Sequence, residues 1–194
     1  MGHSQAEKAE SHKKIVRIAS RKLREDGLEA LSVNELMKAA GLTHGGFYGH
    51  FPSRSALIEE ALTRALAAGA KDAVMPGQDA PDARTTPSLR QYLRAYLSRS
   101  HRDNPGTGCA MAALAGDIGR GPKRLRGLFT RALRAFHDSL ARVMPGDGPA
   151  ARRQSINAVS TMIGALILSR AVDEEALSDE ILLAAKQAVL VLGE

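Results

Sequence analysis

The sequence predicts an all-α protein in which an N-terminal three-helix domain is followed by a larger helical domain, with about nine helices in all. Almost every segment between glycine and proline signals carries apolar residues at spacings of three or four, and no segment alternates with the period of a strand. The 194 residues are 44% hydrophobic but only 4% aromatic. A core of that composition must consist largely of leucine, alanine, isoleucine and valine.

The expected helices begin at capping residues and end at glycine or proline. They cover about residues 11–25, 33–41, 44–50, 54–73, 88–103, 109–118, 122–144, 149–172 and 178–192. Ser32 and Glu35 form a capping box at the start of the second helix, and Thr43 and Ser53 can cap the third and fourth. Segment 75–87, rich in proline, glycine, aspartate and threonine, is the expected linker.

The net charge of +6 permits DNA binding, but its distribution gives that interpretation little support. Residues 1–60 hold nine lysines and arginines against eight acidic residues, whereas residues 84–153 hold fourteen against four. The basic excess therefore lies mostly outside the N-terminal domain. Solvated helix faces explain this excess better than DNA binding does.

A single cysteine, Cys109, excludes an internal disulfide framework and a cysteine-rich zinc site. The longest apolar run, near residues 162–168, is too short to span a bilayer, and the first residues are polar and charged. We therefore expect a soluble, cytoplasmic protein with no metal, no cofactor and no membrane partner.

A helix-turn-helix motif is predicted at about residues 33–50, with a turn that contains Gly41 between a positioning helix and a recognition helix. Generic helical hairpins have the same spacing, so the residue pattern decides. The pattern consists of Ala19, Gly27, Leu31-Ser32-Val33, Ala40-Gly41-Leu42-Thr43, Phe47-Tyr48, His50-Phe51, Ser53-Arg54 and Leu57. It resembles the N-terminal domain of the TetR/AcrR family of transcriptional regulators, although Phe47 stands where many members carry leucine.

The resemblance covers roughly a quarter of the chain and implies a DNA-binding domain at residues 8–56 and an effector-binding and dimerisation domain at residues 57–194. Phe47 and Phe51 lie four apart, share a helix face and are expected in the core. The expected DNA contacts are Ser32, Val33, Asn34, Thr43, His44, Gly45, Gly46, Tyr48, His50 and Arg54. Within this set the resemblance implies that Tyr48, His50 and Arg54 contact DNA phosphates. Arg54 could also be an exposed side chain without a role.

Base reading would fall to His44 and Gly45, with Val33 and Asn34 in reach of the groove. Ser32 and Thr43 can cap helices whether or not they touch phosphate. Because glycine offers no side chain for hydrogen bonding, we expect few base contacts and substantial readout of DNA shape.

The C-terminal part is expected to hold a small-molecule effector or to respond to an oxidant or electrophile. Candidate pocket or sensor residues are Cys109, Tyr92, Tyr96, Met111, Phe129, Phe136, His137 and Met162, each of which could also be ordinary core. Cys109 is expected in the first turn of a helix, where the helix dipole favours a thiolate, and Arg99 and Arg102 are close in sequence. Some redox-responsive TetR-like regulators have a Gly-Cys pair at a similar place.

The last two helices are apolar on almost all sides, which predicts burial against a partner. The expected homodimer interface consists of Ile156, Met162, Ile163, Ile167, Leu182, Val189 and Leu190. The resemblance implies a homodimeric repressor that an effector, or modification of Cys109, releases from a palindromic double-stranded DNA operator.

Two other interpretations remain open from the sequence. A hydrolase that uses Cys109 and His137 would need an orienting partner, and none is recognisable, so we do not expect an enzyme. The modest charge of residues 1–60 also allows a helical ligand-binding or interaction module that does not bind DNA.

Overall fold

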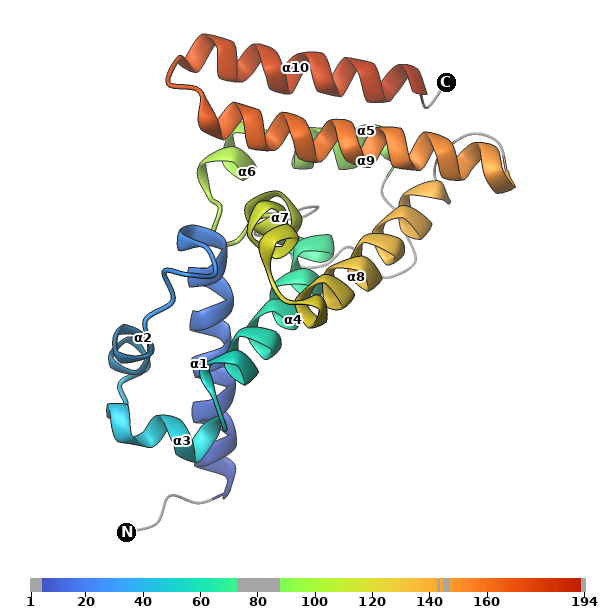
Figure 1. The fold of residues 1–194 in the computed structure, drawn as a ribbon. Helices are drawn as coiled ribbons and strands as arrows, with labels where there is room; N and C mark the ends of the chain where they lie inside the picture. Colours follow the sequence, from blue (N-terminus) through green and yellow to red (C-terminus); the bar gives the residue numbers. More distant parts are fainter. Residues whose placement is uncertain (1–4, 73–87, 143, 145–146, 193–194) are drawn as a thin grey trace.

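The computed structural model describes residues 5–72, 88–142, 144 and 147–192, and within this part of the chain all regular structure is helical (Figure 1). The helices are α1 (Gln5–Asp26), α2 (Val33–Ala40), the 3-10 helix η1 (His44–Gly46), α3 (Phe47–His50), α4 (Arg54–Asp72), α5 (Leu89–Tyr96), α6 (Arg99–Asp103), α7 (Ala110–Arg120), α8 (Lys123–Ala141), α9 (Gly148–Ala171) and α10 (Glu175–Leu192). The predicted all-α class is confirmed. None of the helices in the described ranges is long and apolar enough to cross a membrane.

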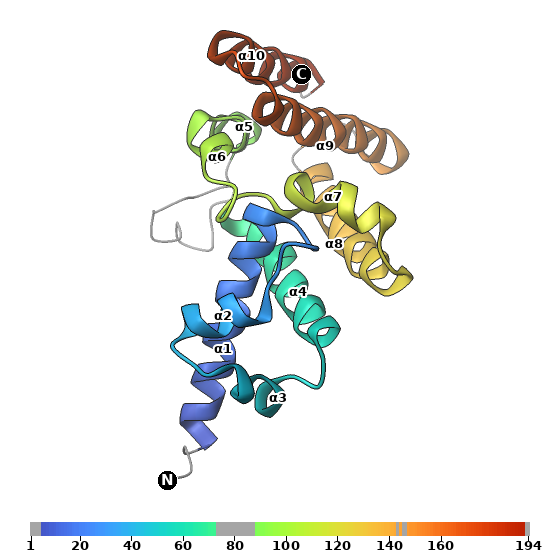
Figure 2. The same cartoon turned by 60° about the vertical axis from the view of Figure 1, so that its left-hand side comes forward.

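The N-terminal helices form one end of the molecule. α1 packs against α2 and, along much of its length, against α4. Figures 1 and 2 show α2 and α3 beside the part of α1 that lies farthest from α9 and α10. The core here is aliphatic apart from Phe47 and Phe51, which agrees with the low aromatic content of the chain.

The helices α9 and α10 form an antiparallel hairpin at the opposite end (Figure 2). Between the two ends, α7 contacts α1, α4, α8 and α9, so it packs on both halves of the molecule. α4 also contacts α7 and α8 as well as α1. The domain boundary between residues 56 and 57 stays a prediction, because α4 shares its buried face with both sides.

The prediction of a single helix over residues 88–103 is wrong, because the structure has two helices there, α5 and α6. The chain leaves the helix at Leu97, whose φ and ψ are −94° and 61°, and α6 begins after Ser98, whose hydroxyl accepts a hydrogen bond from the N–H of His101 at 3.2 Å. Ser98 is a good N-cap residue, so the break had a sequence signal. The expected linker at residues 75–87 lies outside the described residues.

A hydrogen bond joins the N-terminal half to α7. The backbone N–H of Leu28 donates to Oδ2 of Asp117 at 3.0 Å, and Oδ1 of the same carboxylate accepts from Arg120 at 2.9 Å. Leu28 is buried, and its N–H has little access to water. Asp117 therefore satisfies a backbone donor in the loop between α1 and α2.

Replacing Asp117 with alanine is expected to lower the free energy of unfolding by about 1–3 kcal/mol, because the Leu28 N–H loses a charged acceptor in a partly buried position. Urea denaturation measures this change. Asp138→Ala is the control, since it removes an exposed carboxylate whose ion pair with Arg152 spans 3.3 Å; its effect should stay within about 0.5 kcal/mol. Equal effects of the two substitutions would contradict the role of Asp117.

Candidate functional site

The turn of the predicted helix-turn-helix has well-defined hydrogen bonding. Oγ of Ser32 accepts from the N–H of Glu35 at 3.4 Å and caps α2. At the other end Gly41 has a φ of 75°, a conformation that favours glycine, and its N–H donates to the carbonyl of Lys38. The N–H of Leu42 donates to the carbonyl of Met37 at 2.9 Å, which completes a Schellman motif.

The recognition segment has the predicted bounds, residues 44–50, but its first turn is a 3-10 helix. It begins as η1 and continues for one α-helical turn in α3, and Thr43 precedes it without a side-chain capping bond. Gly45 and Gly46, which are poor helix formers, occupy the 3-10 turn. Phe47 and Phe51, only 2% and 1% exposed, hold the segment on the core with ring centroids 5.6 Å apart. The predicted core role of both phenylalanines is confirmed.

The outer side of this segment is open. Tyr48 is 71% exposed, and its ring packs edge-on against Phe47 at a centroid distance of 5.3 Å. A side chain at Gly45 would meet nothing within 4 Å. The other predicted DNA contacts fall into two groups: Asn34, Thr43 and His44 are exposed, and Ser32, Val33, Gly46 and His50 are half-buried. Exposed polar groups therefore gather on one side of a helix that is anchored on the other.

His50 faces partly inward. Its Nδ1 is buried without a hydrogen-bond partner, and its ring lies 6.2 Å from that of His12. Burial, with a smaller contribution from the charges of His12 and Lys8, lowers its pKa. In the free protein the neutral form of His50 is therefore favoured, and a neutral imidazole can still donate a hydrogen bond to a phosphate.

Arg54 has a structural role that the sequence did not predict. Its guanidinium donates to the carbonyls of Leu31 at 3.1 Å, Leu28 at 2.8 Å and Glu29 at 3.2 Å. These three carbonyls belong to the connection between α1 and α2. Arg54 therefore fixes that connection from the start of α4, and its contact with a DNA phosphate stays a prediction.

The C-terminal half contains a cleft of ≈ 490 Å³. Its lining comes from α4, α5, α7 and α8: Thr63, Leu66, Ala67, Tyr92, Met111, Leu128, Arg131, Ala132, Ala135, Phe136 and Ser139. Three of the predicted pocket residues, Tyr92, Met111 and Phe136, lie here together. Tyr92 and Phe136 form an aromatic wall with ring centroids 6.2 Å apart.

The remaining predicted pocket residues do not line this cleft. Tyr96 and Met162 are fully buried in the core, and Phe129 is half-buried against it. His137 faces α9, where Oγ of Ser155 lies 3.4 Å from its Nδ1 and donates to its carbonyl at 2.9 Å. Burial lowers the pKa of His137.

Cys109 is the N-cap of α7, close to the predicted first turn, and is 3% exposed. Its backbone N–H donates to Nε2 of His101 at 2.8 Å, and Nδ1 of the same ring lies 2.7 Å from the carbonyl of Tyr96. Nε2 must therefore be the acceptor and Nδ1 the protonated nitrogen, which makes His101 neutral. A side chain on Gly108 would come within 2.7 Å of the His101 ring, so glycine is required there.

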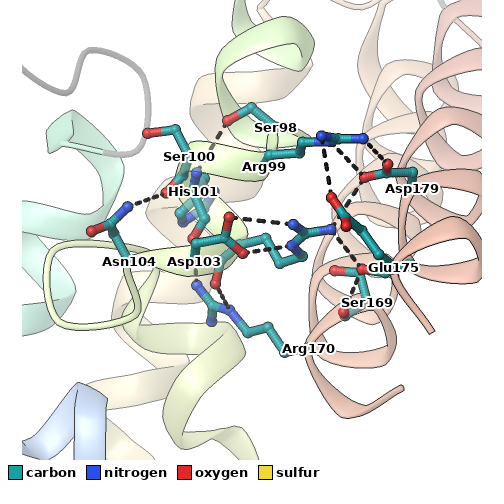
Figure 3. A network of polar contacts seen from close by, with 12 residues as sticks. Ser98, Arg99, Ser100, His101, Asp103, Asn104, Ser169, Arg170, Glu175 and Asp179 are labelled. Atoms are coloured by element: carbon teal, nitrogen blue, oxygen red, sulfur yellow. Dashed lines mark hydrogen bonds and ion pairs between the residues drawn. The ribbon is translucent and has the colours of Figure 1, made fainter. Parts of the chain in front are cut away.

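The cations expected near Cys109 are engaged elsewhere (Figure 3). Arg99 pairs with Glu175 and Asp179 of α10. Arg102 donates to Asp179 at 3.1 Å and to Oγ of Ser178 at 2.9 Å. The two arginines therefore connect α6 to α10. They are not positioned to stabilise a thiolate at Cys109.

Arg170 is the cation that acts on this part of the core, a residue that sequence reasoning missed. It donates from α9 to the carbonyls of His101 at 2.7 Å and Arg102 at 2.9 Å (Figure 3). Burial lowers its pKa, which the charges of Cys109 and Tyr96 partly oppose. An arginine near the end of an apolar helix gave no sequence signal for this contact, because its partners lie 68 and 69 residues away.

The predicted dimer interface divides into buried and accessible residues. Met162, Leu182 and Val189 are at most 4% exposed within one chain, so their prediction as interface residues is wrong. The accessible members are Ile156, Ile163, Ile167 and Leu190, and α9 and α10 also expose Leu168, Leu177, Leu183 and Val191. Because both helices are apolar on nearly all sides, the sequence did not distinguish their inner from their outer faces.

The fold and the helix-turn-helix define a helical DNA-binding protein, and comparison with known proteins shows what its N-terminal part is similar to. Residues 15–61 match the sequence model of bacterial regulatory proteins of the tetR family. No curated protein matches the chain in sequence. The match identifies residues 15–61 as a tetR-type domain and supports a DNA-binding transcriptional regulator.

Solved structures show that the fold extends over almost the whole chain. A TetR regulator from Chloroflexus aurantiacus is 18% identical with a TM-score of 0.76, and the match covers 96% of both chains. NemR of E. coli in its reduced form is 17% identical with a TM-score of 0.70 and covers 94% of this chain and 96% of its own. A TetR-family regulator from Cytophaga hutchinsonii is 16% identical with a TM-score of 0.70 and covers 100% and 98%.

The neutral state of His101 predicts how the fold responds to acid. Burial, with a smaller contribution from Arg170, lowers its pKa, while the bond to the Tyr96 carbonyl opposes the shift. The unfolded chain then binds more protons below the ordinary histidine value of about 6.5, so the His101 contribution to stability is complete above that pH and is lost as the pH falls.

His101→Gln keeps an uncharged acceptor near the Cys109 N–H, so the free energy of unfolding should depend less steeply on pH between about 6.5 and 5 than in the wild type. Urea denaturation across this range tests the expectation. Equal slopes in the two proteins would show that His101 is not held neutral.

Proposed function

We propose that the protein is a homodimeric repressor whose η1–α3 segment enters the major groove of a two-fold-symmetric operator. The observation that carries the proposal is Tyr48, an exposed tyrosine on a short helix whose neighbours Phe47 and Phe51 anchor it to the core. Such a helix can enter a groove without losing its own packing. The two-fold symmetry of a dimer then matches an operator with two half-sites.

Direct DNA contact is assigned to the accessible predicted residues. Tyr48, Thr43 and Ser32 supply hydroxyls for phosphates, and His50 adds a neutral ring nitrogen. His44 and Asn34 are placed to reach base edges, with Val33 beside them. Gly45 and Gly46 let the backbone approach the DNA. Arg54 acts indirectly, because its guanidinium holds the connection that precedes α2.

Dimerisation is assigned to the outer faces of α9 and α10. Ile156, Ile163 and Ile167 are spaced by seven and four residues and so share one face of α9. On α10, Leu183 and Leu190 are spaced by seven and do the same. Exposed apolar side chains on two adjacent helices fit a protein interface.

The effector signal is proposed to reach the DNA-binding half through α7. This helix is capped by Cys109, lines the C-terminal cleft with Met111 and carries, in its last turn, Asp117, which accepts a hydrogen bond from the N–H of Leu28. An effector in the cleft, or an added group on Cys109, would displace one end of α7 and with it the loop before α2. Either input must favour the state with lower DNA affinity.

Tyr48→Phe tests the contact assignment by removing only the exposed hydroxyl. If that hydroxyl donates to a phosphate, affinity for DNA fragments selected from a random pool should fall roughly tenfold whatever the sequence. Fluorescence anisotropy over a salt series measures the affinity. Thr130→Val is the control, since it removes a hydroxyl on α8, and it should bind as the wild type does.

Arg54→Gln separates the two roles considered for that residue. A phosphate clamp would lose about one unit of the salt slope, whereas the positioning role predicts a lower thermal midpoint and an unchanged slope. A fall in the slope without loss of stability would restore the phosphate assignment.

Modification of Cys109 is the proposed redox input. Its thiol is buried beside Tyr92 and Tyr96, whose pKa values burial raises, with a smaller contribution from Cys109 itself. Oxygen atoms added to this sulfur would disturb the start of α7. The similar fold of NemR, solved in a reduced form, fits such an input.

Peroxide or hypochlorite should therefore lower the DNA affinity of the wild type and leave Cys109→Ser unchanged. The same anisotropy assay, before and after treatment, measures this difference. An equal loss in both proteins would exclude Cys109 as the sensor.

A further inference from the structure

The C-terminal cleft is lined mostly by apolar side chains and by one charged side chain. Most of the lining is apolar, with Leu66, Met111, Leu128 and Phe136 as the larger side chains. Among the described residues that line the cleft, only Arg131 is ionised at neutral pH, and none is a carboxylate. A ligand in this cleft therefore meets an apolar surface and one positive charge.

Arg131 is exposed on α8 and has no ion pair or hydrogen bond within the described part of the chain. Two exposed arginines nearby, Arg120 and Arg124, are by contrast each held by a carboxylate, at 2.9 and 2.7 Å. A side chain on Gly127 would lie 3.7 Å from a guanidinium nitrogen of Arg131, so the guanidinium extends back over that glycine. Its charge is available to a ligand.

Tyr92 supplies a second polar group. Its hydroxyl is buried without a hydrogen-bond partner, although the residue lines the cleft. Burial, with a smaller contribution from Cys109, raises its pKa, so the hydroxyl remains a neutral donor. A buried donor without an acceptor is costly, and an oxygen of a bound ligand would remove that cost.

We propose that the cleft binds an apolar organic anion, with its hydrocarbon body against the aromatic and aliphatic wall and its anionic oxygens at Arg131. The volume of ≈ 490 Å³ lies within the range of small-molecule sites. This inference rests on the proposed function, because it assigns a chemical class to the effector of that same regulator. Neutral and cationic molecules of equal shape bind less tightly, since they leave Arg131 unpaired or repel it.

The test compares probes that share a shape and differ in charge. 2-Naphthoate, 2-naphthamide and 2-naphthylmethylammonium form one series, and octanoate with octanol forms a second that lacks an aromatic ring. Isothermal titration calorimetry on the full chain measures each affinity. In at least one series the anion should bind about tenfold more tightly than its neutral partner. In the naphthyl series the cation should bind least tightly.

Arg131→Gln should reduce the affinity of the anion to that of the neutral probe and leave the neutral probe unchanged. Arg134→Gln, an exposed arginine on the same helix that does not line the cleft, is the matched control and should keep the wild-type preference. Tyr92→Phe should weaken both oxygen-bearing probes by a few-fold, because each loses the same hydroxyl donor. Loss of anion binding in both arginine variants would overturn the assignment to Arg131.

A final arm measures DNA affinity with and without the tightest anion. Release of DNA by that anion in the wild type, and not in Arg131→Gln, supports the proposal. DNA binding that persists while no anion exceeds its neutral partner overturns the ligand class and leaves the regulator intact. A chain that binds no selected DNA contradicts the proposed function itself, whatever the cleft binds.

Discussion

The two halves of this molecule depend on how α7 is held at its ends. At its start the N–H of Cys109 is bonded to the neutral ring of His101, and near its end Asp117 accepts the N–H of Leu28. Both bonds replace water at poorly accessible backbone donors, so neither end can move without leaving a donor unsatisfied. A displacement at the cleft or at the thiol can therefore reach the connection that leads into α2.

The DNA-binding end follows a different constraint, because a recognition segment of seven residues cannot be stable alone. Phe47 and Phe51 supply packing that offsets the two glycines in its 3-10 turn. The opposite side of the segment is then free to face solvent or DNA, and Tyr48 is its largest exposed side chain. Arg54 completes the arrangement by fixing the chain before α2, which sets where the positioning helix starts.

Most of the helix boundaries and both aromatic anchors could be predicted, since apolar spacing and capping residues are local signals. The contacts that could not be predicted depend on distant partners. Arg99 pairs with Asp179, which is 80 residues away, and Arg54 bonds to carbonyls of a loop that the sequence does not place beside it. Met162 was assigned to the wrong surface because its helix is apolar on both sides. Ser98 is a capping residue, so the break between α5 and α6 could have been predicted from the sequence, but it was not.

Hydroxyl-radical footprinting on DNA selected from a random pool, combined with the mass of the complex, tests the central claim most directly. The account predicts a two-fold-symmetric site in which two protomers protect half-sites that lie on one face of the DNA, a whole number of helical turns apart. Selected DNA without symmetry, bound by a single protomer, would contradict it.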